Sequence, residues 1–227
     1  MSTKKELIYT VFEKLKINSD DMDITEEFIS SLIDSKRAML IKQRLEKSPW
    51  ATNPEIMQEI CMELENVSVI DGMTCFGKIL RTKNPLPKSI KVKGKMGPVT
   101  VRRMDRVSLL INTVPLERLP FVGYNSFISA MVYAAQDYDG RLYLVSNQKK
   151  HHLLEMIKVA DVFETPDKAD KYSCQSDSSE INCDPWDKDY PIEDSMKDDL
   201  INMIVKELSP TLGIPDDPDN DADGDRG

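Results

Sequence analysis

The stretch FISAMVYAAQDYDGRLYLV, residues 127–145, holds two apolar runs on either side of a tight-turn sequence. The turn contains Tyr138-Asp-Gly140, and glycine tolerates the positive φ that a short hairpin connection requires. We therefore predict two antiparallel strands, over residues 127–135 and 141–145. This hairpin indicates that the middle of the chain is a β domain.

The same sequence pattern extends on both sides of the hairpin, where short β-branched and apolar runs alternate with glycine and proline. These runs predict further strands at residues 67–70, 73–80, 89–92, 99–102, 107–111 and 153–163. We interpret residues 67–163 as one antiparallel β-sandwich or barrel.

The N-terminal part of the chain has helical spacing instead. Thr3 and Glu6 form a capping-box pattern that opens a first helix with an apolar stripe. A second, longer helix is predicted from Thr25 to about Leu45, with acidic residues at its start and basic residues at its end. Asn53-Pro54 predicts the start of a third helix. Its stripe would consist of Ile56, Ile60 and Leu64.

The C-terminal part returns to helical patterns. Thr165-Pro166 opens a short helix over residues 167–172, and Tyr190-Pro191 precedes a long amphipathic helix. Because that last helix must bury its apolar stripe, we expect it to pack on the N-terminal helices. The predicted fold is α+β: a helical bundle from both chain ends with the β domain inserted. Its parts are N-terminal helices (1–66), the β domain (67–163), a loop and C-terminal helix (164–212) and an acidic tail (213–227).

Charge is divided unevenly along the chain. Residues 78–106 contain ten Lys and Arg against one acid, whereas residues 187–227 contain thirteen Asp and Glu against four bases. Each segment can neutralise the other, in the same chain or in a neighbouring copy. This pattern favours assembly over chemistry.

Several functional classes find no support in the composition. No apolar run is long enough to cross a bilayer, and the start lacks the apolar stretch of a signal peptide, so we expect a soluble cytosolic product. The four cysteines have no zinc or redox spacing and are predicted to be free thiols. His151 and His152 are predicted to be surface residues. No nucleophile, phosphate-loop or zinc-protease motif occurs, so we expect no catalytic residue and no cofactor.

Two short motifs have an ordinary and a functional interpretation. Residues 219–224 match the first half of a calcium-binding EF-hand loop, but the chain stops before the required glutamate, so we expect a solvated acidic tail and no metal. Lys91, Lys93 and Lys95 alternate and would share one face of a strand. Such lysines protect sheet edges or form interfaces, and they also follow nucleic-acid backbones. Residues 78–106 lack aromatic residues for base stacking, which favours the first use.

Four motifs of the C-terminal half resemble head-to-tail adaptor and ring proteins of short-tailed phages, and most closely the ring proteins of crAss-like phages. They are DGRLYL at residues 139–144, VADVFETPDKA at 159–169, YPIEDS at 190–195 and the helix at 201–208. The N-terminal helix pair also resembles an adaptor bundle, so that the similarity covers most of the chain.

The resemblance implies a structural virion protein, made in the host cytoplasm, that forms a ring of typically twelve copies below the portal. Its implied partners are the portal, other tail ring proteins, further copies of itself and packaged DNA, with no membrane. The alternatives are a nucleic-acid-binding phage module that uses residues 78–106, or a cytosolic bacterial scaffold. The residues we expect at interfaces are Lys88, Lys91, Lys93, Lys95, Arg102, Arg103, Arg106, Tyr190, Asp216, Asp217, Asp219, Asp221 and Asp223.

Overall fold

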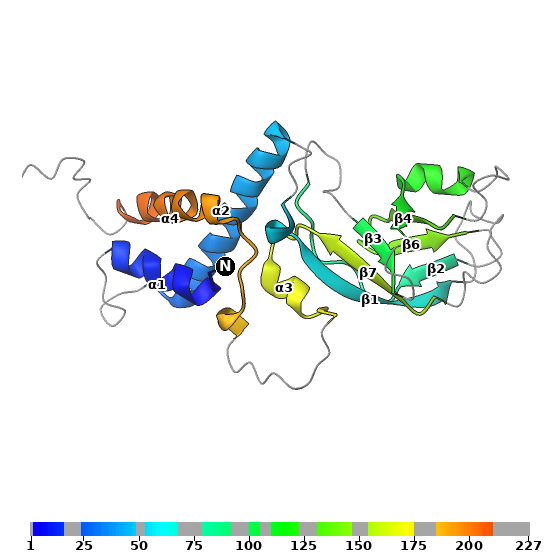
Figure 1. Ribbon diagram of the computed structural model, residues 1–227, viewed down its shortest axis with the longest axis horizontal. Coiled ribbons are helices and arrows are strands. Elements are labelled where there is room, and N and C mark those ends of the chain that lie inside the picture. Colours follow the sequence, from blue (N-terminus) through cyan, green and yellow to red (C-terminus); the bar gives the residue numbers. More distant parts are fainter. Residues whose placement is uncertain are drawn as a thin grey trace, which may run out of the picture. The chain divides into compact units, whose positions relative to one another are not determined.

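The computed structural model describes residues 2–15, 24–48, 53–67, 79–91, 100–104, 110–122, 131–146, 154–174 and 185–210. The chain divides into two compact units. The first, the helical unit, comprises Met1–Leu40 and Asp184–Gly227, and the second, the barrel unit, comprises Ile41–Cys183. Figure 1 shows the long helices mostly in the first unit and the strands in the second.

The helical unit is built from α1 (Lys4–Lys14), most of α2 (Glu26–Lys47) and α4 (Asp194–Leu208), with a 3-10 turn at Pro185–Asp187. The predicted capping box opens α1: the Thr3 N–H donates to Glu6 Oε2 at 3.0 Å, and the Glu6 N–H donates to Thr3 Oγ1 at 3.2 Å. The predicted start of α2 is also confirmed, since Thr25 Oγ1 accepts from the Phe28 N–H.

Apolar stripes from both chain ends are buried in this unit. Helix α1 buries Leu7, Ile8, Val11 and Phe12, and α4 buries Met196, Leu200, Ile201, Ile204 and Leu208. Polar contacts accompany this packing: Lys14 on α1 donates to Asn202 on α4 at 3.1 Å, and Lys36 on α2 pairs with Glu207 on α4. The two ends of the chain therefore build one unit.

The barrel unit contains seven strands: β1 (Gln58–Val67), β2 (Ile79–Thr82), β3 (Thr100–Arg103), β4 (Leu110–Thr113), β5 (Tyr133–Gln136), β6 (Leu142–Val145) and β7 (Met156–Asp161). They close into a barrel in the order β1-β2-β6-β5-β4-β3-β7. Of the two predicted β architectures, the barrel is therefore the one observed. The predicted β5–β6 hairpin is confirmed, with Gly140 at φ 82° in its turn.

One pair of strands departs from the antiparallel prediction. Strands β4 and β5 are parallel, with Asn112 opposite Tyr133, whereas the other neighbouring pairs are antiparallel. The connection between them includes a 3-10 helix, η3 (Leu116–Phe121), and carries the chain back to the end of the barrel where β4 began. A parallel pair needs such a long crossover, and no tight-turn sequence marks it.

The predicted third helix is wrong. Asn53 does cap a turn, but this turn is the 3-10 helix η2 (Pro54–Ile56), and the chain then enters β1. Ile60 and Leu64, four residues apart, fit one face of a helix and equally one face of a strand. Met62, between them, is also buried at 1% exposure, and it establishes the period of two.

Other predicted strands are shifted or shortened. The described part of the run at 89–92 makes one isolated bridge, between Ser89 and Phe163. The short helix after Thr165 is α3 (Pro166–Asp170), which begins and ends earlier than expected. Of the strand predicted at 67–70, Val67 is the last residue of β1; residues 68–70, most of the strand predicted at 73–80, the histidines and the acidic tail lie outside the described residues.

The barrel has an inner and an outer apolar layer. Inward-facing side chains from all seven strands form the inner core, among them Met62, Leu80, Leu144 and Ile157. The opposite faces of β2, β5 and β6 carry a second cluster, including Tyr133 and Tyr143, which is covered by Leu119 of η3. Burial on both faces explains why β6 reads as a continuous apolar run.

Candidate assembly surfaces

Strand β7 organises the basic residues that we expected at an interface. Arg102 of β3 lies opposite Lys158 of β7, and Val101 beside it is buried in the barrel, so Arg102 faces outward. Like charges directly opposite each other on a sheet are destabilising unless a counter-charge is close. Glu59 of β1 supplies one, because it pairs with Lys158. We call Arg102 and Lys158 the outer basic pair.

Lys88 and Lys91 lie further along, beyond the end of β7. The Lys88 carbonyl accepts from the Glu164 N–H at 2.8 Å, and the Ile90 N–H donates to the Val162 carbonyl at 2.9 Å. This segment therefore runs beside the residues that follow β7. Arg103, at the end of β3, lies opposite Ile157 of β7. Three of the predicted residues, Lys93, Lys95 and Arg106, lie outside the described part of the chain.

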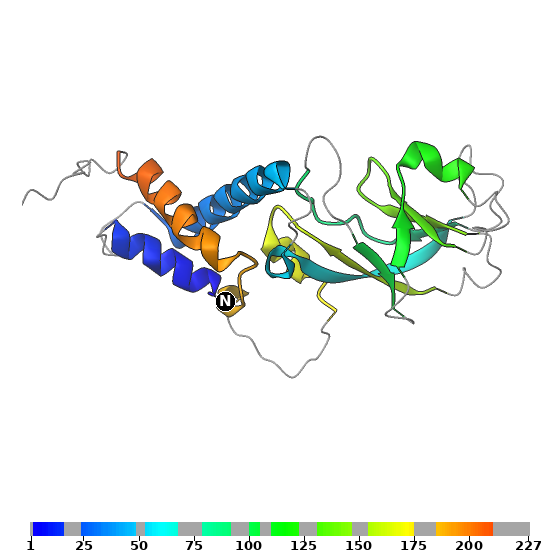
Figure 2. The same cartoon turned by 45° about the horizontal axis from the view of Figure 1, so that its top comes forward.

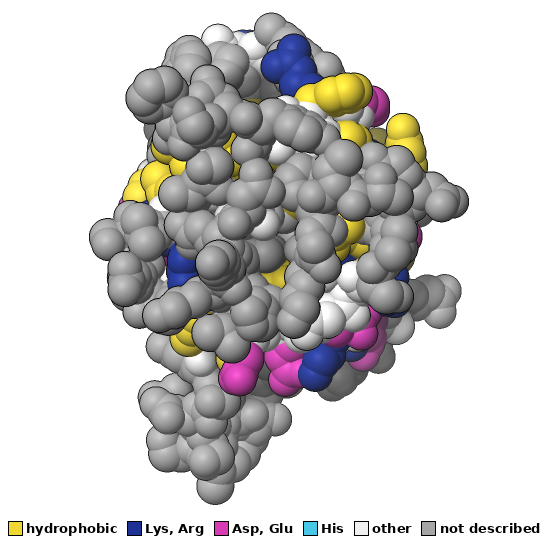
Figure 3. Space-filling view, turned by 90° about the vertical axis from the view of Figure 1, so that its right-hand side faces the viewer, with side chains coloured by type: hydrophobic (Ala, Val, Ile, Leu, Met, Phe, Trp, Pro, Cys, Tyr) yellow, Lys and Arg dark blue, Asp and Glu magenta, His cyan; other side chains and the backbone are white. Residues whose placement is uncertain are grey.

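Other bases of the segment 78–106 are matched within the barrel itself. Lys83 Nζ lies 2.7 Å from Glu63 Oε2, and Arg81 Nε donates to Glu65 Oε1 at 2.9 Å. These hydrogen bonds lower the pKa of both carboxyl groups. Arg141 Nη1 lies 3.6 Å from the same Glu65 oxygen. Figure 3 shows acidic and basic side chains next to each other on this side of the barrel.

Several described acids of the C-terminal segment also have local partners. Asp187 lies 3.2 Å from Lys5 of α1, and Asp194 pairs with Lys197 on α4. The predicted interface acids lie beyond residue 210, outside the described residues: Asp216, Asp217, Asp219, Asp221 and Asp223.

Tyr190 is buried inside the helical unit, with 2% of its surface exposed. Its hydroxyl donates to Asp34 Oδ1 at 2.7 Å, and Lys4 Nζ lies 3.0 Å from the other oxygen of the same carboxylate. The Arg37 guanidinium and the Lys4 ammonium lie 5.6 and 5.7 Å from the centre of the ring, within cation–π range. In this chain Tyr190 therefore holds α1, α2 and the Tyr190-Pro191 turn together.

Sequence reasoning missed the other members of this cluster. Arg37 is fully buried, its Nε donates to the Pro191 carbonyl at 2.6 Å, and burial lowers the pKa of its guanidinium against the opposing effect of Tyr190 and Asp34. Its burial could have been recognised from the sequence, because Arg37 falls within a stripe of residues four positions apart. All members of this stripe are buried: Ile29, Ile33, Arg37, Ile41 and Leu45. A charged residue within an apolar stripe indicates a buried polar cluster.

The free-thiol prediction is wrong for two cysteines, because Cys61 and Cys174 form a disulfide. Their Cα atoms lie 4.9 Å apart, within the usual disulfide range. The prediction rested on a reducing cytosol, and the 113-residue separation of the two cysteines gave no spacing signal against it. Cys75 and Cys183 lie outside the described residues.

Among the described part of the chain, no three His, Cys, Asp or Glu residues are grouped as a metal site would need. None of the described helices is both long and apolar enough to span a bilayer.

Two comparisons with known proteins agree with each other over nearly the whole chain. Residues 6–226 match the model of a family described as phage tail ring protein 2. The chain is also similar to Ring protein 2 of Bacteroides phage crAss001, with 34% identity over 224 residues, which cover 98% of this chain and 97% of that protein. Identity at this level along both chains extends to the helical unit, the barrel unit and the C-terminal segment alike. The chain belongs to the phage tail ring protein 2 family.

Proposed function

We propose that copies of this chain close into a ring that joins the portal to the rest of the phage tail and surrounds the DNA channel. The observation that carries the proposal is the full-length similarity to a ring protein. The role is structural and non-enzymatic, the ring has twelve copies, and the chain is made in the host cytoplasm before it enters the virion.

A ring needs a head-to-tail contact in which two different surfaces of the same chain meet. The barrel offers the outer basic pair, Arg102 and Lys158, of which Lys158 pairs with Glu59. The sequence beyond residue 210 offers six aspartates against one arginine. We infer that the acidic tail of one copy binds the outer basic pair of the next.

The helical unit takes the second role in this proposal. Its α1, α2 and α4 act as the helical bundle that contacts the portal, while the barrel units form the wider part of the ring. A tail that becomes ordered only against its neighbour loses conformational entropy at assembly. Rings would then form only where the portal binds several copies side by side.

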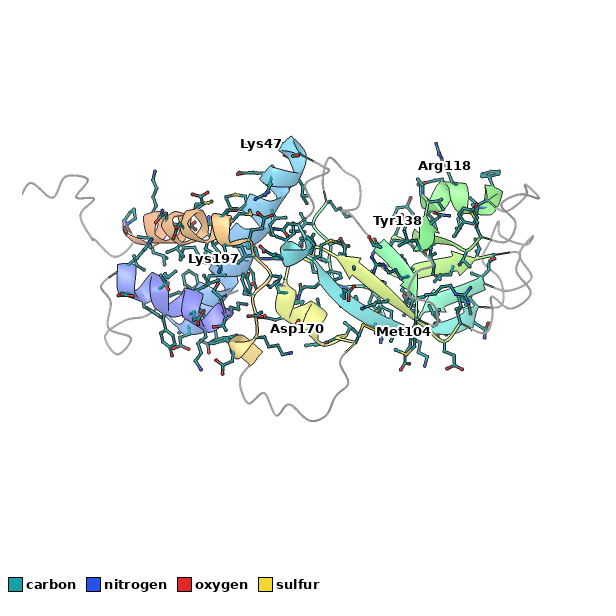
Figure 4. All side chains as sticks on the ribbon, viewed as in Figure 1. Lys47, Met104, Arg118, Tyr138, Asp170 and Lys197 are labelled. Atoms are coloured by element: carbon teal, nitrogen blue, oxygen red, sulfur yellow. A yellow bond between two sulfur atoms is a disulfide. The ribbon has the colours of Figure 1, made fainter. Side chains whose placement is uncertain are left out.

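The test is to mix the purified full-length protein with the portal of the same phage and to count copies by native mass spectrometry and negative-stain imaging. We expect twelve copies in a ring on the portal. Arg102→Glu and deletion of residues 213–227 should each weaken ring closure. Arg118→Glu is the matched control: it makes the same charge change on η3, where Arg118 is exposed and points away from the barrel (Figure 4).

Two results would contradict the proposal. Rings that form equally well without residues 213–227 would exclude the tail contact. A chain that fails to bind the portal but binds DNA or RNA would favour the nucleic-acid module instead. That binding would weaken steeply with salt, by about 0.9 in log–log slope for each phosphate contact on duplex DNA.

A further inference from the structure

The disulfide joins two segments that backbone contacts already hold side by side. The Cys61 N–H donates to the Tyr172 carbonyl at 2.7 Å. The neighbouring residues Ile60 and Ser173 form an antiparallel bridge. The residues up to Cys174 therefore lie along the outside of β1, and the two sulfur atoms meet because the backbones are paired.

Side chains of α3 strengthen the same attachment. Gln58 Nε2, at the start of β1, donates to the Pro166 carbonyl at 3.3 Å and to Asp170 Oδ1 at 3.2 Å. Ala169 is part of the inner core, and Tyr172 packs against it. Both views of the ribbon show α3 beside the start of β1 (Figure 1, Figure 2). These contacts hold α3 on the barrel whether or not the sulfur atoms are bonded.

The bond also has a particular place in the chain. Cys61 is the fourth residue of β1, and Cys174 follows the last element of the barrel, so the covalent loop encloses β2 to β7 and α3. The chain leaves the barrel unit for the helical unit after residue 40 in one direction and after residue 183 in the other. Both connections lie outside the loop.

We propose that Cys61 and Cys174 form an oxidation-dependent clasp, which closes after the barrel has folded and carries tension between the two chain connections past the strands. With the clasp closed, a pull along the chain passes through the S–S bond at Cys61, and it cannot separate the part of β1 beyond Cys61 from β7. The role of the clasp in the phage rests on the proposed function, in which the chain folds in a reducing cytosol and then serves in a released particle through which DNA passes. The clasp itself does not require a ring.

Closure is a thiol–disulfide exchange with a low-molecular-weight disulfide, such as oxidised glutathione. One cysteine thiolate attacks a sulfur atom of the small disulfide, forms a mixed disulfide and releases one small thiolate. The second cysteine thiolate attacks the protein sulfur of that mixed disulfide and releases the other. The protein pair is oxidised by two electrons, the small disulfide is reduced by two, and the two thiol protons pass to the released thiols.

The first test uses the full chain with Cys75→Ser and Cys183→Ser, which keeps only the clasp cysteines. We expect the reduced variant to have the same circular dichroism spectrum as the oxidised one. Oxidised glutathione should close the pair roughly tenfold faster in the folded chain than in guanidinium, because the fold has already closed the loop. Alkylation and intact mass give the rate. An unfolded reduced variant, or equal rates in the two conditions, would overturn the proposal.

The second test measures tension directly by pulling the same variant from its two ends with optical tweezers. The oxidised chain should release a contour length shorter than the reduced chain by about 380 Å, from 113 residues at roughly 3.4 Å each. The matched control is Cys61→Ser with Cys174→Ser, which should release the full length under both conditions. Equal lengths for oxidised and reduced chains would exclude the clasp. Neither test involves the portal, so failure here is separate from failure of the ring proposal.

Discussion

Asp161 is a buried carboxylic acid whose charge is costly. The side chain has no exposed surface, and it accepts hydrogen bonds from the Ser89 hydroxyl and, at 2.7 Å, from the Val162 N–H. Burial outweighs these hydrogen bonds and raises its pKa from 3.8 to about 6. Between these values the folded chain holds the proton more tightly than the unfolded chain. Stability contributed by this residue therefore falls as the pH rises through that window, and it stays lower at neutral pH.

Replacing Asp161 with Asn should stabilise the barrel at neutral pH by up to about 3 kcal/mol. The amide keeps both hydrogen bonds, because its oxygen accepts from Val162 and its NH₂ donates to Ser89. The check is urea unfolding at a series of pH values, where the loss of stability between pH 3.8 and about 6 should disappear. Ser89→Ala should act oppositely, since it removes a bond that favours the charged form. Unchanged pH dependence in Asp161→Asn would contradict this account.

Residues in regular patterns were predictable, whereas residues that depend on partners distant in sequence were not. The Thr3 and Glu6 cap uses neighbours three positions apart, and it was predicted correctly. The Tyr190 cluster joins Asp34 and Tyr190, which lie 156 positions apart, and only Arg37, the one charged residue in the α2 stripe, indicated it. Of the expected interface residues, Arg102 lies opposite β7 and Lys88 contacts the residue Glu164 beyond it, while Tyr190 lies inside the other unit.

Among the elements, the β5–β6 hairpin depends on one glycine. Gly140 has φ +82°, its N–H donates to the Asp137 carbonyl at 3.0 Å, and its carbonyl accepts from the Leu86 N–H at 3.0 Å. A Cβ atom at this position would lie 3.5 Å from Pro85 Cβ, an ordinary contact. The cost of a side chain therefore comes from the backbone conformation alone.

Gly140→Ala should destabilise the barrel by about 1–2 kcal/mol, which is the usual penalty of a left-handed conformation for an alanine. The lowered urea midpoint of the full-length protein measures it. Gly140→Asn is the matched comparison, because asparagine tolerates this conformation and should cost less. An alanine variant as stable as the native chain would show that the turn can change its conformation.

The elements also show where periodicity is ambiguous. Ile60 and Leu64 are four residues apart, which is both one helical turn and two strand repeats, so the preceding Asn53-Pro54 cap decided the prediction in favour of a helix. The segment forms a strand because β1 pairs with both β2 and β7 and buries Met62 on the same face as Ile60 and Leu64. The parallel β4–β5 pair was unpredictable for a different reason: it depends on where a 19-residue connection returns, between Thr113 and Tyr133.

At the scale of the whole molecule, the two units differ in how the chain builds them. The barrel unit is one continuous segment, Ile41–Cys183, and it contains the inner core, the outer cluster and the disulfide. The helical unit needs both chain ends, because the stripe of α4 is buried with those of α1 and α2. The barrel therefore has all of its stabilising contacts in one piece, and the helical unit does not.

We therefore expect a fragment of residues 41–183 to fold alone, with one cooperative unfolding transition and the circular dichroism spectrum of a β protein. A chain truncated after residue 183 should keep that transition but lose most helical signal, since α1 and α2 would expose the apolar stripes that α4 covers. A chain ending at residue 210 is the control, because it keeps α4 and removes only the tail. Full helicity without residues 184–227 would contradict the two-unit account, as would a fragment 41–183 that unfolds without cooperativity. Retention of the helical signal in the chain ending at 210, together with its loss after 183, would assign the folding of the helical unit to α4 and leave the acidic tail free for contacts between copies.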